Sequence, residues 1–210
     1  MKHILLIIAL VLVVAACNLS DKFKKTSSTN SSSPSSTSNG PKSIGDDPVE
    51  QPQPTAAQSA AVAGGESVKW DQQGISWTLP SKWKKQSVTT DNFMYGSGDG
   101  AFLIVSISSM DESFPTEISL RGFHEGAKVR KKNGQVSELK WLELDGVRGV
   151  EFREAKPEVA DSPQRLQWMT YRKYAGQTQL VNVILSSNGT NFDKHQDELY
   201  GILFTMKLVH

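Results

Sequence analysis

Few residues in this sequence have side chains suited to catalytic or metal chemistry. There is a single cysteine, Cys17, and beyond the N-terminal region there are three histidines, His124, His195 and His210. No two of these histidines stand at a metal-ligand spacing, and His124-Glu125 lacks the second histidine of a helical zinc-protease motif. The sequence therefore predicts no metal site and no cofactor site.

A serine nucleophile has little support. Ser97 lies between two glycines in GSGDG, residues 96–100, but not in the G-x-S-x-G pattern of a nucleophile elbow. A dinucleotide-binding loop would open a helix. The loop at residues 96–100 instead precedes the apolar run that begins at Ala101, so we interpret it as a hairpin loop. His124 and His195 fall on predicted helices, and His195 lies beside an apolar face, which favours a hydrogen-bonded core-boundary histidine. We predict a non-enzyme without catalytic residues, with a hydrolase as the less favoured alternative.

The first seventeen residues predict export. Met1-Lys2-His3 is short and basic, residues 4–14 are apolar throughout, and two alanines precede Cys17. A basic start, an apolar stretch of about ten residues and a small-residue exit are typical of a secretory signal peptide. The apolar run is shorter than the roughly twenty residues that a membrane-spanning helix needs. An exported chain with one cysteine has no internal disulfide.

The sequence VAAC, residues 14–17, resembles the lipobox of bacterial lipoproteins. The resemblance implies that residues 1–16 are a signal peptide and that Cys17 becomes a diacylglycerol cysteine, with palmitate, at the mature N-terminus. It also implies a protein of the cell envelope, attached to a bacterial membrane through the Cys17 lipid. Asn18 is not the aspartate associated with inner-membrane retention, which favours the periplasmic face of the outer membrane in a Gram-negative cell. An ordinary signal peptide with an incidental cysteine is the alternative.

The segment from Asn18 to about Glu66 predicts a tether. It is rich in Ser, Thr, Pro, Gln and Gly, and Phe23 is its one aromatic residue. Such a segment cannot bury enough apolar surface to offset the entropy lost on ordering. We therefore predict that residues 17–66 comprise the lipidated cysteine and a disordered tether, and that residues 67–210 fold as one domain. A glycosylated stalk is the alternative, because Asn-x-Ser/Thr triplets occur in the segment.

The pattern after residue 66 predicts a sheet with helices. Residues 75–79 alternate as a strand, while residues 101–108 and 177–187 are apolar on both faces and are expected to form central strands covered on both sides. Helices are expected from about Thr116 to Lys132 and from about Asn191 to Lys207. Hairpin turns are expected at Asp145-Gly146 and Ala175-Gly176. These features predict an α+β fold, a three-layer α/β/α sandwich around a mostly antiparallel sheet.

Several segments, in this order, resemble PsbP-like and DcrB-like domains, which share their fold with the Mog family of Ran-binding proteins. ISWTLPSKWKK resembles their strand–Pro–x–x–Trp start, LDGVRGVEFRE their strand–turn–strand, and NFDKHQDELYGILFTMKL their closing helix. Thr205-Met206 stands where those domains have a Ser-Phe pair. The resemblance spans about Gly74 to Leu208 and implies a PsbP-like fold. It also implies a binding or assembly role, with no shared catalytic residues to carry over.

Two further residue sets admit a functional interpretation. Trp70, Trp77 and Trp83 could form an exposed row that stacks on glycans, but the resemblance places Trp77 and Trp83 in the core, and we favour core packing. The basic cluster at residues 130–132 is interpreted as cations at a helix C-terminus, with a docking patch for an acidic partner as the alternative. With 23 basic and 22 acidic residues, the net charge of +1 gives no field that favours nucleic acid.

These observations lead to one functional prediction. We expect a membrane-anchored cell-envelope lipoprotein whose PsbP-like domain is a non-catalytic binding or assembly module for an envelope protein. A binding protein for a small or amphiphilic ligand is the alternative.

Overall fold

The computed structural model of the chain describes residues 48–209. The predicted signal peptide, the lipidation site Cys17, the predicted tether up to residue 47 and His210 lie outside the described residues. Along the chain the elements are β1 (Val49–Glu50), α1 (Ala56–Val62), β2 (Glu66–Trp70), the 3₁₀ turn η2 (Asp71–Gln73), β3 (Ile75–Leu79), β4 (Trp83–Val88), β5 (Asn92–Ser97), β6 (Ala101–Met110), α2 (Thr116–Lys132), β7 (Val136–Leu144), β8 (Val147–Glu154), β9 (Pro163–Tyr174), β10 (Gln177–Asn188), α3 (Phe192–Phe204) and β11 (Lys207–Leu208).

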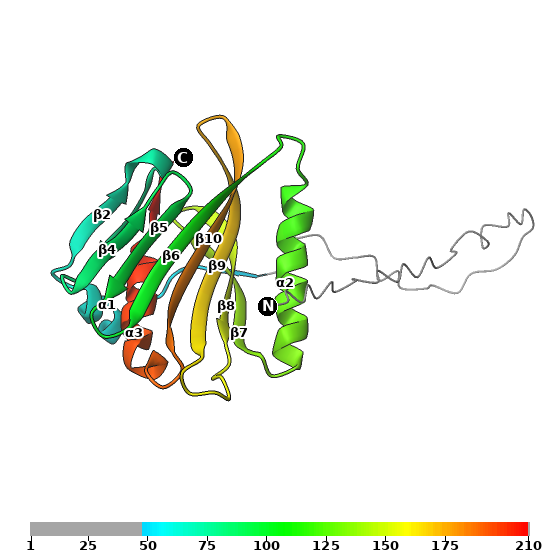
Figure 1. Cartoon of the computed structure of the whole chain (residues 1–210). Coiled ribbons are helices and arrows are strands. Elements are labelled where there is room, and N and C mark those ends of the chain that lie inside the picture. Colours follow the sequence, from blue (N-terminus) through cyan, green and yellow to red (C-terminus); the bar gives the residue numbers. More distant parts are fainter. Residues whose placement is uncertain (1–47, 210) are drawn as a thin grey trace, which may run out of the picture. The chain divides into compact units, whose positions relative to one another are not determined.

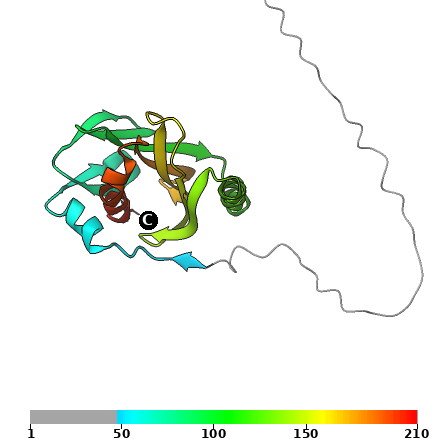
Figure 2. The same cartoon turned by 90° about the horizontal axis from the view of Figure 1, so that it is seen from below.

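Most strands belong to one large sheet. Its eight strands lie in the order β1-β7-β8-β9-β10-β6-β5-β4, and every neighbouring pair is antiparallel except β1 with β7. A small antiparallel sheet has the order β11-β3-β2. Figures 1 and 2 show α2 on one face of the large sheet, called here the outer face, and α3 on the other, the inner face.

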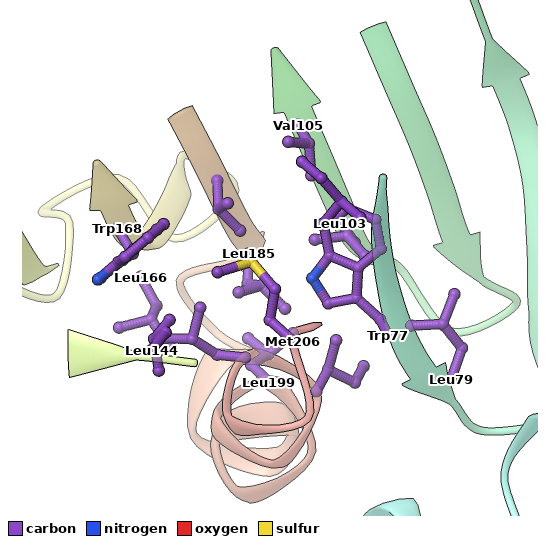
Figure 3. Packing of buried hydrophobic residues seen from close by; sticks show 14 of the residues in the cluster. Trp77, Leu79, Leu103, Val105, Leu144, Leu166, Trp168, Leu185, Leu199 and Met206 are labelled. Carbon is purple, nitrogen blue, oxygen red and sulfur yellow. The ribbon is translucent and has the colours of Figure 1, made fainter. Parts of the chain in front are cut away.

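Two hydrophobic cores hold these layers together. The larger core lies between the inner face, α3 and the small sheet, and Figure 3 shows side chains from all three meeting there. The smaller core lies under α2, where Leu120 and Ala127 pack with Trp141, Val150 and Phe152 of β7 and β8. The predicted fold class is confirmed: the protein has an α+β fold with a mostly antiparallel sheet between helices. The inner layer also contains the small sheet, which the sequence did not separate from the large one.

The predicted helices and turns form. Helix α2 has the predicted bounds, and α3 lies within the range predicted for the second helix. Asp145 and Ala175 adopt left-handed backbone conformations, with φ of 49° and 50°, and each is followed by a glycine with positive φ. Two consecutive left-handed residues make the tight turn that suits the twist of a hairpin. These turns join β7 to β8 and β9 to β10.

The segment just before residue 67 is folded, so the prediction of a disordered tether is wrong for residues 49–66. Strand β1 pairs with β7, and α1 begins with a capping box in which Thr55 and Gln58 exchange hydrogen bonds. Helix α1 packs on α3, where a Cβ on Gly201 would lie 2.5 Å from the backbone oxygen of Gln58. Val62 of α1 is buried in the larger core. The domain therefore begins near residue 49.

The expectation that the central strands are covered on both faces is also wrong. Strands β6 and β10 do lie in the middle of the sheet, and Leu103 and Val183 on its inner face are fully buried. On the outer face, Ile104 and Ile184 stay partly exposed, because α2 packs mainly on β7, β8 and β9. Helix α2 is joined to β7 by residues 133–135 alone, and this short connection keeps it at that end of the sheet.

Candidate functional site

The uncovered part of the outer face is an apolar surface built from three strands. Met94 of β5, Phe102 and Ile104 of β6, and Leu180 and Ile184 of β10 all lie on this face and are partly exposed. We call these five residues the open sheet face. Met94, Ile104 and Ile184 are direct cross-strand neighbours, so they form one continuous row across the strands. The surface follows from strands that are apolar on both faces when one face lacks a covering helix.

Polar groups next to the open sheet face are already paired with one another. Asn182 lies in the next row, beside Ser106, and its side-chain oxygen accepts a 2.7 Å hydrogen bond from Gln167. The row of Met94, Ile104 and Ile184 therefore offers apolar contact area beside an amide oxygen that already has a partner. An exposed apolar patch with a polar margin is typical of a protein-binding surface.

A second feature is a polar cleft of about 230 Å³ between residues 50–58, β7 and α3. Its walls carry charged and amide side chains, among them Glu50, Glu138, Lys140 and Gln196, together with Tyr200. Tyr200 donates a 2.9 Å hydrogen bond to Glu138. This hydrogen bond joins α3 to β7.

Behind the wall of this cleft lies a fully buried carboxylate, Glu151 of β8. Lys140 bridges it to the N-terminal segment, with its Nζ 3.6 Å from Glu151 and 3.3 Å from Glu50. The Tyr200 hydroxyl lies 3.4 Å from the other Glu151 oxygen. Burial raises the pKa of Glu151 to about 7 even though Lys140 opposes the shift, and Glu138 adds to the rise. The carboxyl group buried behind the cleft thus has a pKa close to neutral pH.

The structure does not bring the histidines together. His124 lies on α2 and stacks on Trp141 with ring centroids 4.7 Å apart, whereas His195 lies on α3, on the opposite face of the sheet. His195 is buried, and its Nε2 lies 4.0 Å from a carboxylate oxygen of Asp99, beyond hydrogen-bond distance.

The loop at residues 96–100 joins β5 to β6, which confirms its interpretation as a hairpin loop. The hydroxyl of Ser97 accepts a 2.9 Å hydrogen bond from the backbone N–H of Ala101, so the serine closes the loop. Within residues 48–209, no three His, Cys, Asp or Glu side chains are grouped so as to hold a metal ion.

The tryptophans are core residues. Trp70, Trp77 and Trp83 are 1%, 1% and 5% exposed, so the core prediction for Trp77 and Trp83 is confirmed and an exposed glycan platform is ruled out. Trp83 donates a backbone hydrogen bond to Pro80 and an indole hydrogen bond of 2.8 Å to Glu198. Its ring thereby ties the start of β4 to α3.

The basic cluster lies in the last turn of α2, as predicted. Arg130 pairs with Glu154 at 3.0 Å and lies over the ring of Phe152, so it fixes the helix end to β8. These contacts favour the structural interpretation of the cluster over an acidic-partner patch.

A pocket of about 340 Å³ opens on the small sheet. Its lining combines the apolar residues Ile75, Leu208 and Val209 with the cations Lys69 and Lys207. The two lysines lie on strands that flank β3, in register with the same residue, so their side chains are on one face of the small sheet. The same alternation places the buried side chains of Ile75 and Leu208 on the opposite face, in the larger core, and Lys207 is paired with Asp145 at 3.0 Å. The exposed apolar residue of the pocket is Val209.

Comparisons with known proteins give a similarity at the level of the fold. No family model matches the chain, and no curated protein matches it either. Among solved structures, a Bacteroides thetaiotaomicron protein has 14% identity and a TM-score of 0.42. The match covers 65% of this chain and 46% of that protein.

Two other solved structures match over most of their own length. Cyanobacterial PsbP from Synechocystis has 13% identity and a TM-score of 0.47, covering 69% of this chain and 92% of its own. LpqN of Mycobacterium tuberculosis is described as involved in cell envelope biogenesis. It has 11% identity and a TM-score of 0.48, and the match covers 70% of this chain and 86% of LpqN. These similarities concern the fold alone. In the described part of the chain, no helix combines the length and apolar character that crossing a membrane requires.

Proposed function

We propose that the protein is a lipoprotein of the bacterial cell envelope, attached through Cys17, and that its domain is a non-catalytic binding or assembly module for a protein partner. The open sheet face is the observation that carries the proposal. It presents a continuous apolar row on three adjacent strands. Among the described residues, α2 is the only helix on the outer face, and it packs on β7, β8 and β9 instead.

The dimensions of the open sheet face suit one helix of a partner. Neighbouring strands lie about 4.8 Å apart, so β10, β6 and β5 together span roughly 10 Å between their outer axes. An α-helix with side chains is about 10 Å wide. A partner helix with an apolar side would therefore complete the layer that α2 begins, and it would bury Phe102, Ile104 and Ile184.

Site-specific photocrosslinking tests the binding surface. A benzoylphenylalanine residue placed at position 184 of the full-length protein, irradiated in intact membranes, should form an adduct with a polypeptide. The matched control places the same residue at position 158, where Glu158 is exposed in the loop between β8 and β9. Adduct formation at position 184 that does not exceed the control would contradict a protein-binding role for this face.

The lipid anchor is tested separately. Cys17→Ser removes the thiol that would be acylated, so the variant should lose incorporation of labelled fatty acid and leave the membrane fraction. Wild-type protein processed in parallel provides the control. A variant that still carries lipid and stays in the membrane fraction would refute the anchor.

A second candidate function, binding of an acidic amphiphile, is favoured by the pocket on the small sheet. An alkyl group would contact Val209, and an anionic head group would lie near Lys69 and would compete with Asp145 for Lys207. Ser76 lines the same pocket, so Ser76→Trp should fill it and abolish binding of a fluorescent fatty acid. Equal binding by the variant and the wild type would eliminate this candidate.

A further inference from the structure

The N-terminal segment of the described structure, residues 48–62, is held to the domain by few contacts. Strand β1 pairs with β7 over two residues, and Glu50 adds an ion pair of 3.3 Å with Lys140 of β7. Helix α1 has seven residues, and Val62 is the one that it buries. A segment with so little buried apolar surface opens at a lower free energy than the core of a domain. A change in one of its contacts therefore shifts the balance between a docked and a released segment.

One of these contacts is shared with a buried carboxyl group. Lys140 lies opposite Glu151 in the sheet, with its Nζ 3.6 Å from the Oε2 atom of Glu151. Glu151 is fully buried, and within residues 48–209 this Oε2 accepts no hydrogen bond. The ammonium group of Lys140 is therefore divided between Glu151 and Glu50. Because a buried carboxylate is costly unless it is fully paired, Glu151 competes with the N-terminal segment for this lysine.

Among the described residues around Glu151, no second cation is free. Arg153, two residues further along β8, pairs with Glu138 at 2.6 Å. Trp168 lies opposite Glu151 on β9 and carries no charge, and α1 contains no charged residue. The charged and titratable groups that face Glu151 are Glu50 of β1, Glu138 and Lys140 of β7, Arg153 of β8 and Tyr200 of α3. Within this set, Lys140 is the cation that can balance a charge on Glu151.

We propose that the N-terminal segment is a pH-controlled clasp, docked on the domain when Glu151 is protonated and released when Glu151 ionises. Three changes on release favour the ionised carboxylate. The negative charge of Glu50 moves away, and Lys140 is left to pair with Glu151 alone. Water also gains access to the polar cleft of about 230 Å³, which residues of the segment line together with Lys140 and Tyr200. The docked segment therefore favours the neutral form of Glu151, and the released segment favours the charged form.

Rising pH therefore favours release. In the docked state, burial raises the pKa of Glu151 to about 7 even though Lys140 opposes the shift, and Glu138 and Glu50 add to it. All three changes on release lower this pKa. The docked form thus holds the proton more tightly, and its advantage is lost as pH rises through about 7. A pKa that is lower by one unit in the released form makes the ratio of released to docked segment about tenfold larger at high pH.

Release changes how far the domain reaches from its anchor. Strand β2 begins at Glu66, so a released segment adds residues 49–65 to the connection that precedes the domain. This length of chain spans at most about 60 Å when fully extended. The binding module is thereby held on a shorter connection at acid pH and on a longer one at alkaline pH. This consequence rests on the proposed lipid anchor, whereas the docking and release of the segment do not.

A nitroxide spin label on α1 measures the release. The label is attached through Ser59→Cys, at an exposed position, in a full-length chain that also carries Cys17→Ser, so that one thiol reacts. The ratio of mobile to immobile signal should rise at least tenfold between pH 5.5 and pH 8.5. With Glu151→Gln added, the spectrum should be the same at both pH values, because the amide cannot ionise. A control label attached through Lys128→Cys, exposed on α2, should not respond to pH.

Three results would overturn the clasp. A label at position 59 that is equally immobile at both pH values would show that the segment stays docked. An undiminished response to pH in Glu151→Gln would assign the release to another group. A parallel change at position 128 would show that the whole domain loosens. Because the labelled chain lacks Cys17, each of these results is independent of the lipid anchor, which labelled fatty acid tests separately.

Discussion

Glu151 makes stability depend on pH in a direction opposite to that of most carboxyl groups. Its pKa is raised from 4.5 to about 7, chiefly by burial. Between these values the folded protein binds a proton that the unfolded chain does not bind, so the free energy of unfolding falls as pH rises. The stabilisation is complete below about pH 4.5 and is lost as pH rises through about 7. A difference of about 2.5 pKa units corresponds to about 3 kcal/mol.

Replacing the carboxyl group by an amide removes this dependence. Glu151→Gln keeps the shape of the side chain but cannot ionise. When pH is raised from 5 to 8, the unfolding free energy of the variant minus that of the wild type should therefore increase by about 2–3 kcal/mol. Guanidinium unfolding at fixed pH values, followed by tryptophan fluorescence, measures the difference. Glu158→Gln, in an exposed loop, controls for the loss of one negative charge. A stability difference between Glu151→Gln and the wild type that is the same at every pH would refute the reasoning.

A substitution of Lys140 tests whether this lysine affects the pKa of Glu151. Lys140 lowers the pKa of Glu151, so Lys140→Met should raise that pKa further and make the loss of stability above pH 7 steeper. A pH dependence in Lys140→Met that is the same as in the wild type would show that the lysine does not affect the pKa of Glu151 in the folded protein.

Two other substitutions test the packing. Trp83→Ala should cost about 3–5 kcal/mol of unfolding free energy, because the ring is buried and its indole N–H bonds to Glu198, whereas Trp83→Phe should retain most of the stability. An unchanged Tm in Trp83→Ala would contradict the core role. Gly201→Ala should displace α1, since the new Cβ would lie 2.5 Å from the backbone oxygen of Gln58, and elastase should then cut within residues 56–62. Equal resistance of this variant and the wild type would show that α1 does not depend on the close approach.

The sequence predicted the parts of the fold that local patterns determine. The apolar stripe of α2 and the Asp145-Gly146 turn are encoded within a few residues, and both form as expected. Helix α1 was missed because AAQSAAV contains one residue that becomes buried, Val62, and its support comes from Gly201, far along the chain. No local pattern signals such a contact.

The candidate surfaces were partly predictable for the same reason. The two apolar faces of β6 and β10 are visible in the sequence, but which half of the outer face α2 covers depends on the order of the strands in the sheet. The raised pKa of Glu151 depends on burial by neighbours from β7 and α3. An acidic residue in a strand shows none of this before the chain is folded.

The two edges of the large sheet are protected against aggregation in different ways. At one edge, β4 carries Lys84 and Lys85 and a register shift between Lys85 and Ser87, features that discourage pairing with another strand. At the other edge, β7 has nine residues and is covered by β1 only opposite Trp141 and Leu142. Proteolysis between β1 and α1 would remove this cover and leave β7 as a free edge strand, open to edge-to-edge association with other chains.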